Sequence, residues 1–157
     1  MKYHEPVLLS EVLEHLKVNK GKKYIDCTLG DGGHAIEILK KGGIVLGLDI
    51  NEESLQRAKQ RITQELDKSL QKNFFAVLGN FKNIDELVKG GLLQDFSQVD
   101  GILYDLGYSS FQMDEGEEGL SFQRDLPLDM RLDKSLGVTA ADLINVLSES
   151  QLTELIF

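Results

Sequence analysis

The sequence predicts an α/β fold with an open, mainly parallel β-sheet and helices packed against it. Short runs rich in apolar and β-branched residues alternate with segments of helical periodicity over most of the chain. These strand-like runs are continuously apolar rather than alternating, which is typical of parallel strands buried on both faces. A length of 157 residues is enough for one domain with a core of its own.

The first two thirds of the chain supply the expected elements in order. The sequence predicts a helix from Pro6 to about Leu16, a strand at 24–29, a helix at 34–41 that stops at Gly42, a strand at 44–50, a long helix capped by Asn51, a strand within "NFFAVLGNF" (73–81), a short helix that begins at Asn83, and a strand within "VDGILYDLG" (99–107).

The pattern changes after Gly107. Residues 108–138 have little periodicity and many charges, so we expect a long loop of the kind that usually carries function or is disordered. Thr139 then caps "AADLINVL", and "SESQ" from Ser148 is a capping box that opens one more helix.

Charge is spread unevenly along the chain. The net charge is −9, but residues 1–83 are nearly neutral and residues 84–157 carry 4 basic against 15 acidic side chains. A nucleic-acid enzyme usually has a basic surface, so this distribution counts against RNA as a substrate. No window has the composition of a signal peptide or a membrane span, and the lone Cys27, expected in the core, fits a cytoplasmic protein without disulfides.

The stretch "YIDCTLGDGGH" (24–34) places a glycine-rich turn directly after the first strand. Gly30-x-Gly32-x-x-Ala35, followed by Asp49 nineteen residues after Gly30, satisfies the dinucleotide-binding pattern. Asp26 disfavours that interpretation, because its carboxylate would lie near the diphosphate. S-adenosylmethionine has no phosphate, and its ammonium group tolerates nearby carboxylates. Asp49 would then accept hydrogen bonds from the ribose hydroxyls, unless it only begins the following helix.

The third and fourth strands end in "GNF" and "DLG". The carboxyl ends of neighbouring parallel strands form the ligand site in open α/β sheets. Phe81 is therefore a candidate for contact with the adenine face, with plain core packing as the alternative. Asp105 ends a buried strand, where an unpaired carboxylate is costly, so we expect a functional acid rather than a structural cap.

These motifs together resemble a known family. "HEPVLLSEVL", "YIDCTLGDGGH", "GLDIN", "GNF", "VDGILYDLGYSSFQMD" and "GLSFQRDLPLDMRLD" followed by "TAADLIN" are similar, in order and spacing, to the bacterial RsmH (MraW) family. The resemblance runs from His4 to Phe157. It implies an S-adenosylmethionine-dependent methyltransferase of class I fold that modifies N4 of a cytidine in 16S rRNA, in the decoding region of the small ribosomal subunit.

The resemblance also implies a set of site residues. It predicts cofactor contacts at Gly32, Gly33, His34, Asp49, Phe81, Asp105 and Gln112. His34 and Gln112 rest on the resemblance alone, and His34 would otherwise be a structural hydrogen-bonding residue. The sequence departs from the family at Tyr108, Phe111, Glu118, Leu120 and Leu126, and Glu118 replaces an arginine in the loop expected to face RNA.

The family is about twice as long as this chain. We therefore expect residues 1–135 to be the N-terminal part of the methyltransferase domain, and 136–157 to begin a helical insertion domain that is cut short. A four-stranded sheet ordered 3-2-1-4 would leave the edge of its fourth strand unpaired, so a homodimer is a possible assembly.

The expected chemistry centres on one acid. Asp105, with the backbone at Leu106 and Gly107, is the candidate acceptor for the N–H protons of cytosine N4, unless it serves only the cofactor. Tyr108 is a candidate for stacking on the base, or it packs under the loop. Asp129 and Asp133 lack His or Cys partners, so we predict no metal site.

Arg124, Arg131 and Lys134 are the cations of the long loop, and we expect them to pair with nearby aspartates rather than with phosphate. Two rival functions stay open: an NAD-dependent oxidoreductase, and a non-catalytic remnant that binds cofactor or a partner.

Overall fold

The computed structural model describes residues 3, 5–89, 95–108, 113 and 116–157. The chain divides into two compact units, Met1–Gly107 and Tyr108–Phe157, and each is described by itself. The predicted boundary at residue 135, between the methyltransferase domain and a helical insertion domain, stays a prediction.

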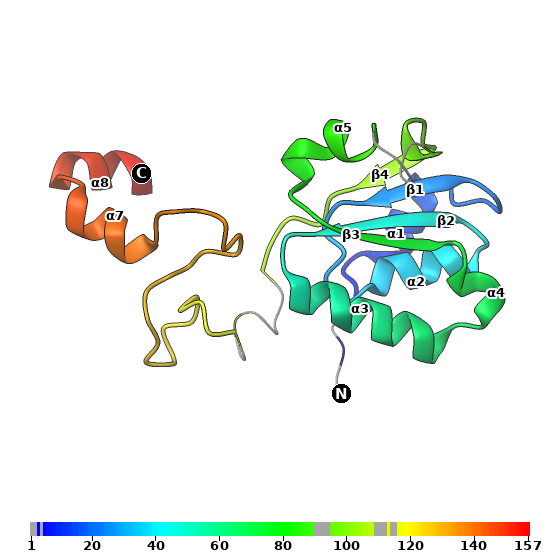
Figure 1. Ribbon diagram of the computed structural model, residues 1–157, viewed down its shortest axis with the longest axis horizontal. Coiled ribbons are helices and arrows are strands. Elements are labelled where there is room, and N and C mark those ends of the chain that lie inside the picture. The colour runs from blue at the N-terminus through cyan, green and yellow to red at the C-terminus, as the bar shows by residue number, and fades with distance from the viewer. Residues whose placement is uncertain (1–2, 4, 90–94, 109–112, 114–115) are drawn as a thin grey trace. The chain divides into compact units, whose positions relative to one another are not determined.

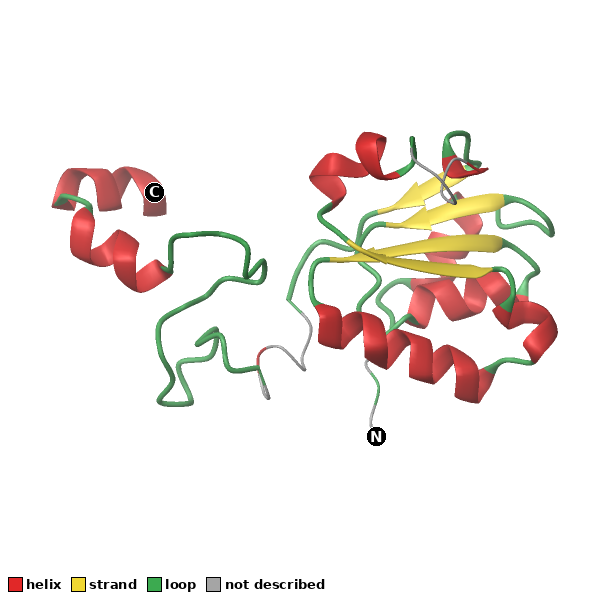
Figure 2. Cartoon of the chain, in the orientation of Figure 1, coloured by secondary structure: helices red, strands yellow, loops and turns green. Residues whose placement is uncertain are grey.

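The first unit is built on a parallel sheet of four strands (Figures 1 and 2). They are β1 (Lys23–Asp26), β2 (Ile44–Asp49), β3 (Phe74–Leu78) and β4 (Gly101–Leu103), and the strand order is β3-β2-β1-β4. Every pairing is parallel, with Ile25 of β1 opposite both Leu46 and Ile102. The predicted α/β class and strand order are confirmed.

Helices cover both faces of this sheet (Figure 1). One core cluster joins β1 and β2 to α1, α2 and α3, and the other packs Phe96 and α5 against the opposite face. The helical elements of this unit are α1 (Leu9–His15), α2 (Gly33–Lys40), α3 (Glu52–Glu65), α4 (Lys68–Gln71), the 3₁₀ turn η1 (Phe81–Asn83) and α5 (Ile84–Leu87).

Burial differs between the inner and outer strands. β1 and β2 are almost fully buried, as predicted, whereas β3 and β4 have exposed positions such as Phe75 and Ile102. The expectation of burial on both faces is therefore wrong for the two outer strands, each of which is flanked by only one strand. Cys27 is 3% exposed and lies in the core, as predicted.

Local signals set several helix ends. The Asn51 side chain accepts a hydrogen bond from the Ser54 amide at 3.0 Å, which confirms the predicted cap of α3. The first helix begins at Leu9 rather than Pro6, because Leu8 takes a left-handed conformation with φ of 51°. Such a conformation cannot continue a right-handed helix.

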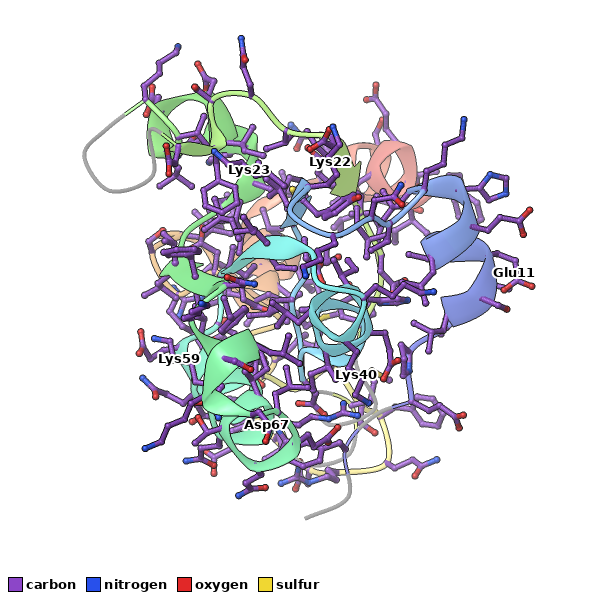
Figure 3. The ribbon with its side chains drawn as sticks, turned by 90° about the vertical axis from the view of Figure 1, so that its right-hand side faces the viewer. Glu11, Lys22, Lys23, Lys40, Lys59 and Asp67 are labelled. Carbon is purple, nitrogen blue, oxygen red and sulfur yellow. The ribbon has the colours of Figure 1, made fainter. Side chains whose placement is uncertain are left out.

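Two lysines, Lys22 and Lys23, lie at the amino end of β1, and each forms an ion pair with an aspartate (Figure 3). Lys22 Nζ lies 2.8 Å from Asp100 Oδ1, and Lys23 Nζ donates to the Asp95 carbonyl at 2.6 Å. These positive charges are matched by neighbouring carboxylates and lie at the end of β1 opposite to the glycine-rich turn.

The second unit holds α7 (Ala140–Val146) and α8 (Glu149–Ile156). Thr139 and Ser148 both form the predicted capping boxes, with Asp142 and Gln151 as partners. None of the residues described in this unit is buried. Across the described part of the chain, no helix combines the length and hydrophobicity needed to cross a membrane.

Candidate functional site

Three aspartates mark the carboxyl edge of the sheet. Asp26 ends β1, Asp49 ends β2, and Asp105 follows β4 by two residues. Since β1 pairs with both β2 and β4 in parallel, the three side chains belong to the same edge of the sheet, next to the glycine-rich turn that links β1 to α2.

Asp49 ties the end of β2 to that turn. Its Oδ2 accepts a hydrogen bond from the Gly30 amide at 2.9 Å, and its Oδ1 accepts one from the Asn51 amide at 2.9 Å. Burial raises the pKa of this carboxyl, while the two amides act in the opposite direction. Each carboxylate oxygen has a second lone pair, so Asp49 can accept further hydrogen bonds from a ligand.

Asp26 is the most enclosed acid of the site, with 1% of its surface exposed. Its Oδ1 accepts a hydrogen bond from the Thr28 amide at 3.2 Å. Its pKa is raised from 3.8 to about 6, mainly by burial. Asp49 and Asp105 also act to raise it, and the Thr28 amide and His34 act to lower it. The aspartates thus repel one another electrostatically, and a cation between them would relieve that repulsion.

Two glycines of the turn, Gly32 and Gly33, make room for other parts of the protein. Gly32 has φ of +75°, and a Cβ there would lie 3.3 Å from the Ala58 Cβ of α3. A Cβ on Gly33 would lie 3.1 Å from the ring of Pro6. The side-chain space that the sequence assigned to a cofactor is occupied by α3 and the N-terminal segment. Cofactor contacts at Gly32 and Gly33 stay predictions, and they would be made by backbone atoms.

An ion pair that the sequence did not predict connects α3 to the turn. Arg57 Nε and its terminal nitrogen donate to the two carboxylate oxygens of Asp31 at 2.8 and 3.1 Å, and both side chains are largely buried. Arg57 and Arg61 both lie over the Tyr3 ring, at 5.9 and 4.8 Å from its centroid.

His34 connects the N-terminal segment to Asp105. The ring is buried, and its Nε2 lies 2.9 Å from the Val7 carbonyl oxygen. Its Nδ1 lies 4.0 Å from Asp105 Oδ2. The Asp105 amide donates to Thr28 Oγ1 at 2.7 Å, which fixes the backbone that carries this acid. His34 thus makes the hydrogen bond of a structural residue, and its contact with the cofactor stays a prediction.

The aromatic candidates are placed differently. Phe81 is half-buried, packs against the core cluster under α5, and meets Tyr104 edge-on with 5.4 Å between ring centroids. This supports the core-packing interpretation, and contact with adenine stays a prediction. Tyr108 is exposed and opens the second unit, and Gln112 lies outside the described residues.

The loop cations of the second unit are engaged. Arg131 Nε donates to Asp129 Oδ1 at 2.6 Å, and Lys134 lies 3.3 Å from Asp129 Oδ2 and 3.6 Å from Glu118 Oε1. Arg131 and Lys134 keep the pKa of Asp129 well below its usual range. Arg124 donates to the Gly116 carbonyl at 2.8 Å. The predicted pairing of Arg131 and Lys134 with acidic neighbours is confirmed.

No cluster suited to a metal ion is present in the part of the chain that the structure describes. Groups of three or more His, Cys, Asp or Glu side chains in a ligating arrangement were found nowhere among those residues.

Known proteins resemble this chain along its whole length. A protein named ribosomal RNA small subunit methyltransferase H from Carboxydothermus hydrogenoformans is 45% identical over 156 residues, which cover 98% of this chain and 47% of that protein. A protein of the same name from Mycoplasma mycoides is 41% identical over 160 residues, 100% of this chain and 49% of its own. The chain spans about half the length of the curated relatives it matches.

Solved structures and a family profile complete the comparison. The C-terminal domain of precorrin-6Y C5,15-methyltransferase from Rhodobacter capsulatus superposes with a TM-score of 0.51 at 16% identity, over 68% of this chain and 55% of that one. The predicted class I methyltransferase fold is therefore confirmed. Residues 1–157 match the profile of the MraW methylase family. With that match and relatives about 40% identical, the chain belongs to the MraW methylase family.

Proposed function

We propose that this chain forms the S-adenosylmethionine-binding part of a methyltransferase that modifies the N4 amine of a cytidine in 16S rRNA, in the decoding region of the small ribosomal subunit. Family membership and the names of the relatives support an rRNA substrate. The chain spans about half the length of those relatives, so the names of the relatives do not establish that this chain catalyses the reaction alone. That it does so is proposed here.

The observation that carries the proposal is the arrangement of charge at the carboxyl edge of the sheet. Asp26, Asp49 and Asp105 all belong to this edge, and Asp49 accepts the amide hydrogen of Gly30. In a dinucleotide site, the amides of the glycine turn bind a diphosphate. Here one of those amides is engaged, and the surrounding carboxylates would repel phosphate. The same carboxylates suit a ligand that carries a sulfonium and an ammonium group.

The residues present fit that ligand, and each has a role. When bound, S-adenosylmethionine supplies an activated methyl group. Asp49 has lone pairs left for the ribose hydroxyls, and Phe81 offers a ring at the end of β3. Asp105 accepts an N–H hydrogen of the cytosine amine, which concentrates the nitrogen lone pair on the attacking atom. Tyr108 stacks on the target base once that base has left its helical stack.

Further proposals concern the setting of the reaction. We place the protein in the cytoplasm, with 16S rRNA in the small subunit as its partner and a homodimer as a possible assembly. Gln112 and His34 complete the proposed cofactor contacts.

A second candidate function is a non-catalytic one, in which the chain binds the cofactor or a partner but transfers no methyl group. The engaged cations of the second unit favour it, since Arg131 and Lys134 are paired with carboxylates and offer little for RNA phosphates.

One experiment separates the two candidates. Small ribosomal subunits lacking the modification are incubated with labelled S-adenosylmethionine and either this chain or the Carboxydothermus relative, and the nucleosides are identified by mass spectrometry. Label in N4-methylcytidine with both proteins supports the proposed function. Label with the relative only, together with cofactor binding by this chain, supports the non-catalytic alternative.

A further inference from the structure

The proton of His34 is fixed by a backbone group. A carbonyl oxygen has no hydrogen to donate, so the 2.9 Å contact between Nε2 and the Val7 carbonyl requires that Nε2 carry one. In the neutral imidazole the other nitrogen, Nδ1, then holds a lone pair. The N-terminal segment therefore sets the tautomer of a ring that belongs to α2.

That lone pair faces the acid proposed to contact the amine. Nδ1 lies 4.0 Å from Asp105 Oδ2, so two acceptors face each other with no hydrogen atom between them when the pair is unprotonated. The His34 side chain is 7% exposed and held in place, whereas that of Asp105 is 46% exposed and accessible to a substrate. One added proton would convert the repulsion between these two atoms into an attraction.

Acidic groups lie around the His34 ring. Asp26 on β1 interacts electrostatically with His34, Asp49 and Asp105, and Cys27 beside it is a buried thiol whose pKa is raised by burial. On the α1 side, His34 meets the Val7 carbonyl dipole.

From this geometry we infer that His34 and Asp105 form a proton-accepting pair for the amine that is methylated, an inference that rests on the proposed function. The nitrogen that gains a methyl group must lose one proton. The nitrogen lone pair would form the bond to the methyl carbon while the carbon–sulfur bond of the donor breaks and leaves its electron pair on sulfur. The proton passes from nitrogen to Asp105 Oδ2, and the N–H electron pair stays on nitrogen. The Nδ1 lone pair of His34 attracts the O–H of the protonated Asp105 until that proton is released to water. Asp105 is the catalytic residue, and His34 is a positioning residue that acts through it.

The tautomer is tested without any turnover. In a nitrogen–proton correlation NMR spectrum of the chain at about pH 9, where histidine rings are ordinarily neutral, the His34 ring should carry its proton on Nε2. His34→Gln identifies the resonance, because the chain has only three histidines. A proton found on Nδ1 would overturn the inference, since His34 would then present no lone pair to Asp105.

A matched pair of variants tests the role in catalysis. Gln at position 34 keeps a donor for the Val7 carbonyl but places no basic atom beside Asp105, so His34→Gln should lower single-turnover rates at saturating S-adenosylmethionine about tenfold or more. His15→Gln on exposed α1 is the control and should react at the wild-type rate. A loss confined to cofactor affinity, with the saturated rate unchanged, contradicts the inference.

Failure of the proposed function gives a different result. In that case the wild-type chain itself transfers no methyl group, and the NMR measurement alone decides whether the pair has the inferred protonation.

Discussion

Asp49 shows how one side chain can serve the fold and a ligand together. Its two oxygens accept amide hydrogens from the glycine turn and from the start of the α3 connection, so it joins two strand ends. The sequence correctly predicts Asp49 at the end of the second strand. It offers two roles for this residue, a ribose acceptor or an acid that only begins the next helix. The geometry allows both, because carboxylate oxygens accept more than one hydrogen bond each.

The buried acid Asp26 carries a cost for stability that depends on pH. Its pKa is raised to about 6 in the folded protein, so between pH 3.8 and about 6 the folded state holds a proton that the unfolded chain has released. The stability contribution is therefore complete below pH 3.8 and is lost as pH rises through about 6, a loss of about 3 kcal/mol.

We predict that Asp26→Asn raises the free energy of unfolding at pH 7.5 by up to about 3 kcal/mol. Asn keeps an oxygen for the Thr28 amide and needs no ionisation. Urea unfolding between about pH 4 and 8 measures it, and the variant should have the flatter profile. Asp67→Asn, at an exposed position that makes no side-chain cap bond to α4, is the control. Parallel profiles for the Asp26 variant and wild type would contradict the prediction.

At the scale of elements, the sequence did not predict the ion pair that connects α3 to the glycine turn. Asp31 and Arg57 lie 26 residues apart and form a two-point ion pair that is largely buried. Removing one partner of such a pair leaves an uncompensated charge.

Arg57→Ala should lower the free energy of unfolding by about 3 kcal/mol. Lys59→Ala, at an exposed position on the same helix, should change it by less than about 0.5 kcal/mol. Chemical denaturation measures both. Equal small effects would mean that the ion pair does not hold α3 against the turn.

Elements with local signals were predictable, and those set by neighbours were not. The Asn51, Thr139 and Ser148 caps are written in a few adjacent residues, and all three form. Strand ends depend on where the neighbouring strands stop, so the fourth strand, predicted within 99–107, spans only Gly101–Leu103. α4 and η1 were missed because segments this short carry too little periodicity to recognise.

The same distinction holds within the site. The residue types at the strand ends were readable, since parallel strands bring their carboxyl ends to one edge. What fills the space beside Gly32 and Gly33 was not readable, because Ala58 and Pro6 come from distant segments of the chain.

At the scale of the whole molecule, the core formed by the described residues lies in the first unit. Every buried residue among those described precedes residue 108, and both core clusters draw only on that unit. The second unit is held by capping boxes and by ion pairs around Asp129.

A chain of residues 1–107 should therefore unfold cooperatively, with a free energy of unfolding within about 1 kcal/mol of the full chain. Circular dichroism during urea unfolding measures it. A broad, non-cooperative transition for 1–107, with cooperativity restored in 1–135, would place the boundary where the sequence suggested it.

We propose that the acidic edge of this sheet binds a cationic sulfonium donor rather than a diphosphate. Isothermal titration calorimetry of the full chain with S-adenosylmethionine and with NADH tests it most directly. We predict saturable heat with the sulfonium ligand, at least tenfold weaker binding after Asp49→Ala, and no heat with NADH. Binding of NADH without binding of S-adenosylmethionine would contradict the account.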